Sequence, residues 1–282
     1  MTVSDSSTKK ETGGRSNLTV RLLSGLVLGP LVLLLVFLGG WPFIGLVVVL
    51  AVVSLLEFYA MGHGRGMQGN TIVGLIAIAA LLFLFLTGQY IVLTLVFLLA
   101  GIAVYIIEML RGNADRWGRV AVTLAGLAYA GFPSAFLGVI RNAPDAVFWM
   151  LFIIFITWGT DTFAYFGGRF WGKRPLAPRI SPKKTVEGAV VGLVLGFLLG
   201  VVVLALYGKV SAGTIVLALL GPPLAVIGDL FESQLKRFFG VKDSHLSWLN
   251  LIPGHGGVLD RTDSLIWVTT LCYLYMLLGG ML

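Results

Sequence analysis

The chain has 282 residues, of which 57% are hydrophobic and only 12% are charged. Soluble domains carry about 25% charged residues, so this composition excludes an ordinary soluble protein and indicates a chain embedded in a bilayer. The net charge is +7, but the cations lie in loops between apolar runs. They favour anionic lipid headgroups and phosphate ligands as partners, and argue against nucleic acid.

The N-terminus is a polar tail, and nine apolar runs follow it. We expect residues 1–16, rich in Ser, Thr and Gly, to be disordered. A helix crosses the hydrocarbon layer with about 20 apolar residues. The sequence therefore predicts an all-α, polytopic integral membrane protein of about nine transmembrane helices, at residues 20–40, 43–60, 71–88, 90–110, 120–138, 147–167, 188–207, 212–231 and 263–281.

The distribution of Lys and Arg predicts how these spans are oriented. With the N-terminus in the cytoplasm, every Lys and Arg except Arg141 and Lys209 falls on the cytoplasmic side. That bias is the positive-inside rule. We expect a protein of the bacterial cytoplasmic (inner) membrane whose N-terminus and active site face the cytoplasm.

Residues suited to chemistry concentrate in the second half of the chain. Spans one to five form an N-terminal transmembrane region, 17–145, with short loops and few acids. We interpret Glu57 and Glu108 there as interfacial or helix-packing residues. Spans six to nine, 146–282, hold two long polar segments on the cytoplasmic side, so this region is predicted to be catalytic, with a polar cavity facing the cytoplasm.

Span six and the loop after it contain an acid and a group of cations. Asp161 lies inside an apolar run, where a carboxylate is costly; it indicates either function or a buried pair with Arg or Lys. The cations of residues 169–174 need no explanation beyond the positive-inside bias. Residues 181–187 place hydroxyls and lysines at the expected start of span seven, which suits a phosphate. The candidates are Ser181, Lys183, Lys184, Thr185 and Glu187.

The end of span eight carries a polar stripe. Asp229, Glu232, Ser233, Lys236 and Arg237 follow one another at i, i+3, i+4, i+7 and i+8, which places them on one helical face. An amphipathic exit helix with an internal salt bridge would explain this pattern. A carboxylate at membrane depth equally indicates a functional site.

A glycine-rich segment precedes span nine. Gly256 and Gly257 follow His255 and allow backbone amides to approach a phosphate. Asp260 and Asp263 come next, at i and i+3. With Asp229 they would form an all-oxygen site of the kind that suits Mg²⁺. A turn followed by an ordinary acidic helix cap is the simpler alternative.

Together these segments resemble the signature of the phosphatidate cytidylyltransferase (CDP-diacylglycerol synthase) family. The resemblance is carried by residues 233–237, Lys242 and Asp243, and residues 253–263, and upstream by residues 161–169 and 181–188. It is specific across about residues 158–267. One departure is the stretch between Asp243 and Pro253, which is longer than the family usually has. It leaves open where Asp243 lies relative to the glycine-rich residues 253–257, called the glycine loop below.

The resemblance implies an enzyme of phospholipid biosynthesis that converts CTP and phosphatidate to CDP-diacylglycerol and pyrophosphate. It also implies dependence on Mg²⁺, with a second cation left open, and a homodimer. We assign the metal to Asp161, Asp229, Asp260 and Asp263. The catalytic candidates are Lys236, Arg237, Lys242, Asp243 and Arg261. The substrate-binding candidates are Ser181, Lys183, Lys184, Thr185, Glu187, Ser233, His255, Gly256 and Gly257.

Two other functions fit parts of the pattern. A related CTP-dependent enzyme would use another lipid acceptor, such as an isoprenoid or ether-lipid phosphate. A transporter of an anionic substrate would also contain intramembrane acids and broken helices. A transporter, however, would place its charges near the midplane, whereas here they gather at one face. A third alternative, a structural membrane scaffold, predicts no clustered carboxylates, and the clusters in this sequence contradict it.

Overall fold

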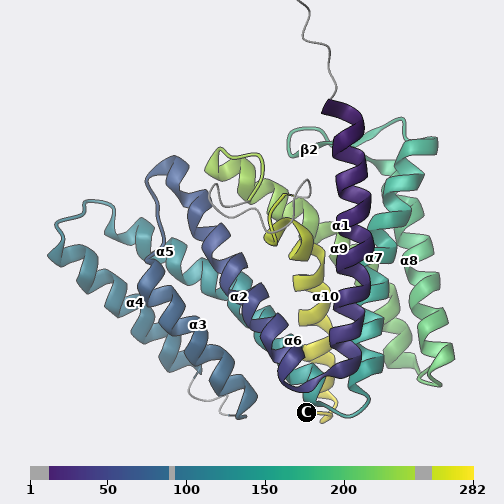
Figure 1. Ribbon diagram of the computed structural model, residues 1–282, viewed down its shortest axis with the longest axis horizontal. Helices are drawn as coiled ribbons and strands as arrows, with labels where there is room; N and C mark the ends of the chain where they lie inside the picture. Colours follow the sequence, from purple (N-terminus) through teal and green to yellow (C-terminus); the bar gives the residue numbers. More distant parts are fainter. Residues whose placement is uncertain (1–12, 89–92, 245–255) are drawn as a thin grey trace, which may run out of the picture.

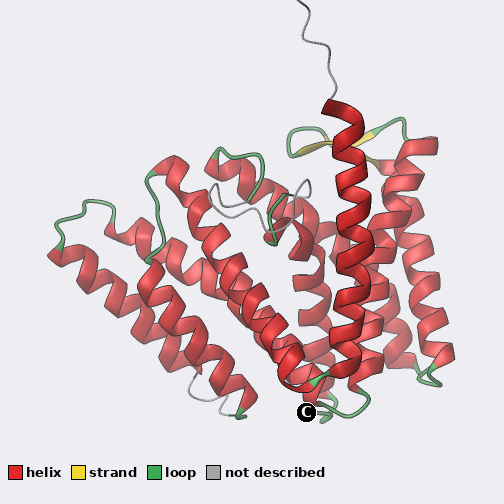
Figure 2. Ribbon diagram, in the orientation of Figure 1, coloured by secondary structure: helices red, strands yellow, loops and turns green. Residues whose placement is uncertain are grey.

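The structure is a computed structural model that describes residues 13–88, 93–244 and 256–282. These residues form a bundle of helices with one short hairpin (Figures 1 and 2). The predicted helical class is thus confirmed. Helix α1 begins at Gly13, inside the predicted tail, while residues 1–12 lie outside the described part.

Each predicted span overlaps a described helix, although the bounds differ. The N-terminal region contains α1 (Gly13–Leu38), α2 (Gly40–Gly62), η1 (His63–Arg65), α3 (Thr71–Leu86), α4 (Leu93–Leu110), α5 (Arg116–Gly126), the π-helical turn η3 (Leu127–Gly131) and α6 (Phe132–Asn142). The C-terminal region contains α7 (Ala146–Trp171), β1 (Pro175–Ala177), β2 (Ser181–Thr185), α8 (Val186–Leu206), α9 (Ala212–Phe239) and α10 (Leu259–Leu278). The fifth predicted span falls across α5, η3 and α6.

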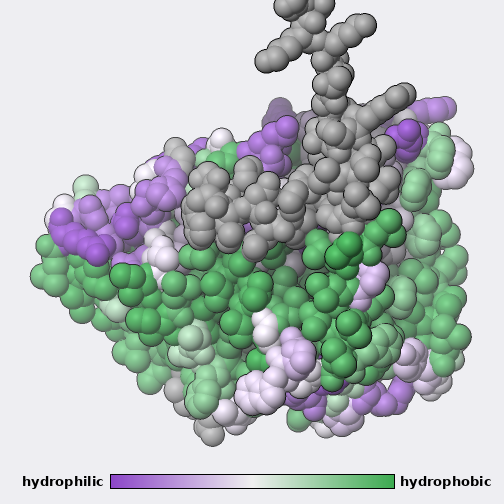
Figure 3. Space-filling model, viewed as in Figure 1, coloured by the Kyte–Doolittle hydropathy of each residue, from purple (hydrophilic) through white to green (hydrophobic). Residues whose placement is uncertain are grey.

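Several of the described helices have the length and apolar composition of transmembrane helices. Five helical segments are long and apolar enough to cross one: Gly40–Gly62, Arg116–Asn142, Ala146–Trp171, Val186–Leu206 and Ala212–Phe239. Shorter apolar helices accompany them. Figure 3 shows a broad hydrophobic band between two more hydrophilic edges. The chain is therefore an integral membrane protein by its helices, and the count of nine spans stays a prediction.

The helices run back and forth between two ends of the bundle. The end with β1, β2, the end of α9 and the start of α10 is called the hairpin end below; it is uppermost in Figure 1. Helix α2 also finishes there. The α1–α2 and α8–α9 connections and the C-terminus lie at the opposite end. This alternation brings the two polar segments of the C-terminal region to one end.

Small residues let the C-terminal helices approach closely. On α8, a Cβ atom at Gly192 would lie 2.8 Å from the carbonyl oxygen of Thr160 on α7. On α9, a Cβ atom at Gly228 would lie 2.7 Å from the carbonyl oxygen of Asp263 on α10. Because these contacts are with backbone atoms, no side chain could move aside. The glycines therefore fix the helix spacing around the polar residues.

A short hairpin stands where the sequence predicts a loop, at residues 175–185. Its strands pair antiparallel, with Pro175 opposite Thr185 and Ala177 opposite Ser181. Thr185 then caps α8, since its Oγ1 accepts a hydrogen bond from the amide of Gly188 at 3.2 Å. The predicted helix start in residues 181–187 is confirmed.

Candidate functional site

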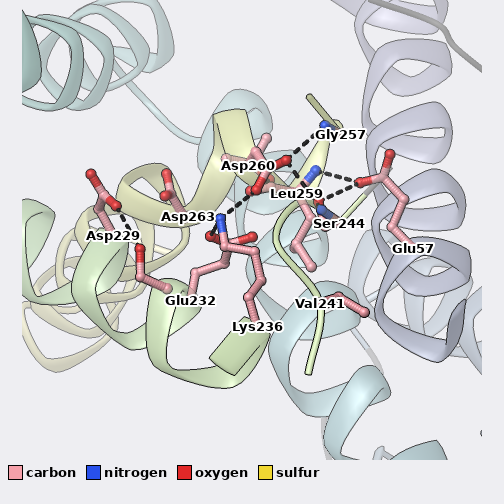
Figure 4. Close-up of polar contacts among 12 residues, drawn as sticks. Glu57, Asp229, Glu232, Lys236, Val241, Ser244, Gly257, Leu259, Asp260 and Asp263 are labelled. Carbon is pink, nitrogen blue, oxygen red and sulfur yellow. Dashed lines mark hydrogen bonds and ion pairs between the residues drawn. The ribbon is translucent and has the colours of Figure 1, made fainter. Parts of the chain in front are cut away.

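Four segments bring charged side chains together at the hairpin end. Strand β2 contributes Lys184, and the start of α10 contributes Asp260 and Asp263. Helix α9 contributes the acids of its polar stripe, Asp229 and Glu232, called the acidic stripe below. Helix α7 contributes Asp161. The close-up in Figure 4 shows Lys236 of α9 between the acids of α9 and α10.

Lys236 links the two helices that carry most of the acids. Its Nζ forms an ion pair with Glu232, one turn earlier on α9, and lies 2.6 Å from Oδ1 of Asp260 on α10. The three side chains are only 11%, 1% and 8% exposed. The internal salt bridge expected of an amphipathic exit helix therefore exists. It is buried against α10, however, because Gly228 lets the two helices touch.

Asp229 is paired from a different direction. Its carboxylate forms an ion pair with Lys184 of β2 and accepts a hydrogen bond from Ser233 Oγ at 3.4 Å. The hairpin thus carries one of the predicted phosphate-binding lysines to the acidic stripe. Lys183 next to it is exposed.

Three aspartates from three helices share one region. Asp161, Asp229 and Asp263 repel one another electrostatically, and Glu232 adds to the repulsion at Asp263. Asp263 is 6% exposed and accepts a hydrogen bond from the Ser264 amide at 2.7 Å. Among the residues described, no three His, Cys, Asp or Glu side chains are arranged to enclose a metal ion. The cluster is nonetheless rich in the hard oxygen donors that Mg²⁺ prefers.

Asp260 holds the base of the glycine loop. Its Oδ2 accepts hydrogen bonds from the Gly257 amide at 2.8 Å and the Ser244 amide at 3.3 Å. Gly256 has a φ of 76°, a conformation that favours glycine, and a Cβ atom there would lie 2.5 Å from Oδ2 of Asp260. Both oxygens of Asp260 are therefore engaged by groups of the chain itself.

The long stretch after Asp243 does not separate the motifs on either side of it. Ser244 lies against Gly257, where a Cβ atom would be 2.3 Å from the serine Oγ. Asp243 is adjacent to Ser244 and is exposed, as is Lys242. The backbone next to Asp243 therefore lies at the base of the glycine loop, through the contacts of Ser244 with Asp260 and Gly257. His255 lies outside the described residues.

Two candidate residues, Glu187 and Arg237, contact the hairpin and the residues beside it, and not the acidic cluster. Glu187 accepts hydrogen bonds from the Lys173 and Arg174 amides at 3.0 and 3.1 Å and from Arg174 Nε at 2.9 Å. Arg237 donates to the carbonyl oxygens of Ile180 and Val241 at 3.4 and 3.1 Å. These two residues hold the hairpin on α8 and α9.

The remaining candidates lie around the same end. Ser181 is partly buried in the hairpin, and Arg261 is exposed on the first turn of α10. Ser233 contacts Asp229 as described above. The structure thus brings together Asp161, Lys184, Asp229, Ser233, Lys236, Gly256, Gly257, Asp260 and Asp263, with Arg261 within electrostatic range of Asp161. The other described candidates, Ser181, Lys183, Thr185, Glu187, Arg237, Lys242 and Asp243, lie around this group.

Sequence reasoning missed the role of one acid. Glu57, interpreted as a packing residue, accepts hydrogen bonds from the amides of Val258 and Leu259 at 2.9 and 2.7 Å. The available signal was an acid near the cytoplasmic end of an apolar run. By contrast, Glu108 is the packing residue expected: its carboxylate lies 2.8 Å from Arg119 Nε and 3.2 Å from Arg111 Nη1.

Comparisons with known proteins cover nearly the whole chain. Residues 19–278 match the model of the cytidylyltransferase family. The phosphatidate cytidylyltransferase of Brucella abortus biovar 1 (strain 9-941) is 35% identical over 262 residues, which cover 92% of this chain and 93% of the relative. That of Bacillus subtilis (strain 168) is 34% identical over 271 residues, 92% and 97%. The similarity therefore includes the N-terminal region, where only hydropathy had supported the resemblance.

Proposed function

We propose, from the membership of this chain in the cytidylyltransferase family, that it transfers the cytidylyl group of CTP to phosphatidate, forming CDP-diacylglycerol and pyrophosphate. The chain is a CTP-using nucleotidyltransferase. The choice of phosphatidate is carried by one observation: the relatives that match 92% of the chain are phosphatidate cytidylyltransferases.

The reaction's main obstacle is electrostatic. In the proposed step, an oxygen of the lipid phosphate attacks the α-phosphorus of CTP, the α–β phosphoanhydride bond breaks, and pyrophosphate leaves. Both reactants are anionic, so charge neutralisation and positioning contribute more than covalent catalysis. The lipid phosphate is already ionised near neutral pH, so the step needs no strong general base.

The ion pairs of the site supply exchangeable cations. Lys184 and Lys236 are each paired with carboxylates, Asp229 for the first and Glu232 with Asp260 for the second. A phosphate that enters the cluster would compete with these carboxylates for the ammonium groups. We propose that Lys184 and Lys236 bind substrate phosphates, and that the exposed Lys183, Lys242 and Arg261 extend the cationic surface.

We propose that Mg²⁺ supports this reaction. Mg²⁺ usually binds through one or two carboxylates together with waters and substrate phosphates, so a closed cage of protein ligands is not required. Asp229 and Asp263, with Asp161 beside them, would hold the ion, which would lower their mutual repulsion and neutralise phosphate charge. Asp260 would join them only by giving up Lys236. A second cation is compatible with the same excess of carboxylates.

We propose that the hairpin end faces the cytoplasm of a bacterial inner membrane. The described cations near the loops of this end include Arg65, Arg111, Arg174, Lys184 and Lys242, whereas Arg141 and Lys209 lie toward the opposite end. The positive-inside rule assigns the cation-rich end to the compartment that contains CTP.

A homodimer is the oligomeric state that we propose, and light scattering of the protein in detergent tests it.

The test is pyrophosphate release by the purified protein in detergent, with CTP and phosphatidate, in the presence and absence of Mg²⁺. We expect release only when all three are present, together with formation of CDP-diacylglycerol. Release with another lipid phosphate, but not with phosphatidate, would mean that this other lipid is the acceptor. A folded protein without release from any lipid phosphate would contradict the proposal and favour transport.

A further inference from the structure

One carboxylate of the N-terminal region reaches the start of α10. Glu57, near the end of α2, is only 3% exposed. Its Oε1 accepts a hydrogen bond from the Val258 amide at 2.9 Å, and its Oε2 accepts one from the Leu259 amide at 2.7 Å. These partners lie 201 and 202 positions later in the chain. A single side chain therefore ties the two halves of the molecule together at the hairpin end.

Glu57 completes the N-terminus of α10. The first amides of a helix have no partner inside it, and the helix N-terminus carries partial positive charge. The residue at the N-cap position, Val258, has an apolar side chain, which makes no cap hydrogen bond to the helix. The Glu57 carboxylate supplies from α2 both the acceptors and the negative charge that a capping side chain would provide.

The geometry around Gly257 shows how closely this contact is built. A Cβ atom at Gly257 would lie 2.5 Å from Oε2 of Glu57 and 2.3 Å from Oγ of Ser244. Ser244 Oγ in turn donates to Oε2 of Glu57 at 3.4 Å. Glycine is therefore required at 257 because Glu57 and Ser244 occupy the space that a side chain would fill.

Two carboxylates hold the loop base from opposite sides. Asp260 accepts hydrogen bonds from the Gly257 and Ser244 amides and reaches Lys236 with its other oxygen. Glu57 contacts the same segment from α2, as Figure 4 shows. Asp260 thus faces the charged cluster, whereas Glu57 lies behind the loop.

We infer that Glu57 is a positioning residue for the transfer reaction. It holds the base of the glycine loop and the first turn of α10, so that Asp260 stays opposite Lys236 and Asp263 stays beside Asp229. The effect on turnover rests on the proposed function. The anchoring of residues 257–260 does not, and it is measured separately.

The test is the variant Glu57→Gln in the full-length protein. A carboxamide keeps the shape but has only one acceptor oxygen, and its NH₂ group would face a backbone donor. We expect kcat to fall about 10- to 100-fold, the usual effect of removing a group that orients active-site ligands. Hydrogen exchange of the backbone amides in peptides covering residues 257–260 should become faster, with or without substrates.

Glu108→Gln is the matched control. Glu108 is as deeply buried as Glu57 and sits in the same half of the chain, but its partners are Arg111, Arg119, Asn70 and Asn113. We expect this variant to keep the kcat of the wild-type protein and to leave exchange at 257–260 unchanged. If Glu57→Gln does not fold, Glu57→Asp asks the same question, because it keeps the charge but withdraws it by one methylene.

The outcomes separate the inference from the proposed function. Wild-type kcat and unchanged exchange at 257–260 in Glu57→Gln would overturn the inference. Equal losses of kcat in the Glu57 and Glu108 variants would also overturn it, since both would then report general stability. If the wild-type protein does not convert phosphatidate, the proposed function fails, and the exchange comparison still decides whether Glu57 anchors the loop.

Discussion

Buried acids have different partners in helices α1–α6 and in helices α7–α10. In the first group, Glu108 is surrounded by donors, with Arg119 and Arg111 at 2.8 and 3.2 Å and the Asn70 amide group at 3.2 Å. In the second group, Glu232 and Asp260 share one lysine. A buried charge is costly unless it is paired. Glu108 is therefore neutralised by cations of its own region, whereas in the second region two buried acids have one lysine between them, an excess of negative charge on which the proposed metal site depends.

Glu57 is the exception that connects the two regions. It is an acid of the first group whose hydrogen-bond partners belong to the second. The comparison teaches that buried acids in this protein are distinguished by their partners, and not by their depth or position along a span.

Asp263→Asn should have the largest effect. The change removes a negative charge from the aspartate cluster and keeps the side-chain size, so we expect kcat to fall by about 10³, as for the loss of a central electrostatic contact. The measurement is CDP-diacylglycerol formation by a variant whose circular dichroism and elution volume match the wild-type protein. Near-normal turnover would remove Asp263 from the proposed metal site.

Lys236→Met should damage both activity and stability. It leaves the buried carboxylates of Glu232 and Asp260 without their shared cation. Breaking a buried ion pair in this way costs about 3–5 kcal/mol. Thermal unfolding in detergent should show a markedly lower midpoint. An unchanged midpoint would mean that the two acids find other partners, and the contrast with the first region would be lost.

Gly228→Ala tests the close approach of α9 and α10. A Cβ atom there would lie 2.6 Å from Trp267 Cδ1 and 2.7 Å from the Asp263 carbonyl oxygen, so we expect a loss of about 1–3 kcal/mol from overpacking and reduced turnover. Gly45→Ala on α2 is the control, because nothing lies within 4 Å of a Cβ atom at that position. Equal thermal stability of the two variants would argue against tight helix spacing.

Lys209→Ala should have the smallest effect. Its ion pair with Asp145 lies at the opposite end of the bundle, and the two side chains are 38% and 51% exposed. Exposed pairs contribute about 0–1 kcal/mol. We expect wild-type turnover and almost the same unfolding midpoint. Lys184→Ala makes the same change at the hairpin end, and should lose activity because Lys184 contacts Asp229.

Much of the fold and part of the site follow from local patterns. Apolar runs longer than a bilayer's width predict the helices. The i, i+3, i+4, i+7 spacing correctly places Asp229, Glu232 and Lys236 on one face of α9, because helical periodicity is a local property. The ion pairs Lys184–Asp229 and Lys236–Asp260 could not be derived in this way, since each joins elements far apart in the chain.

The sequence by itself determined the membrane class, the family and the end of the molecule at which the charges gather. These depend on composition, run length and motif spacing, which are written along the chain. Only the tertiary structure decided that residues 175–185 form a hairpin, that Asp260 holds Ser244 and Gly257, and that Glu57 caps a helix some 200 residues away. The physical reason is that a buried carboxylate must find donors in space, and the nearest donors in space are not its neighbours in sequence.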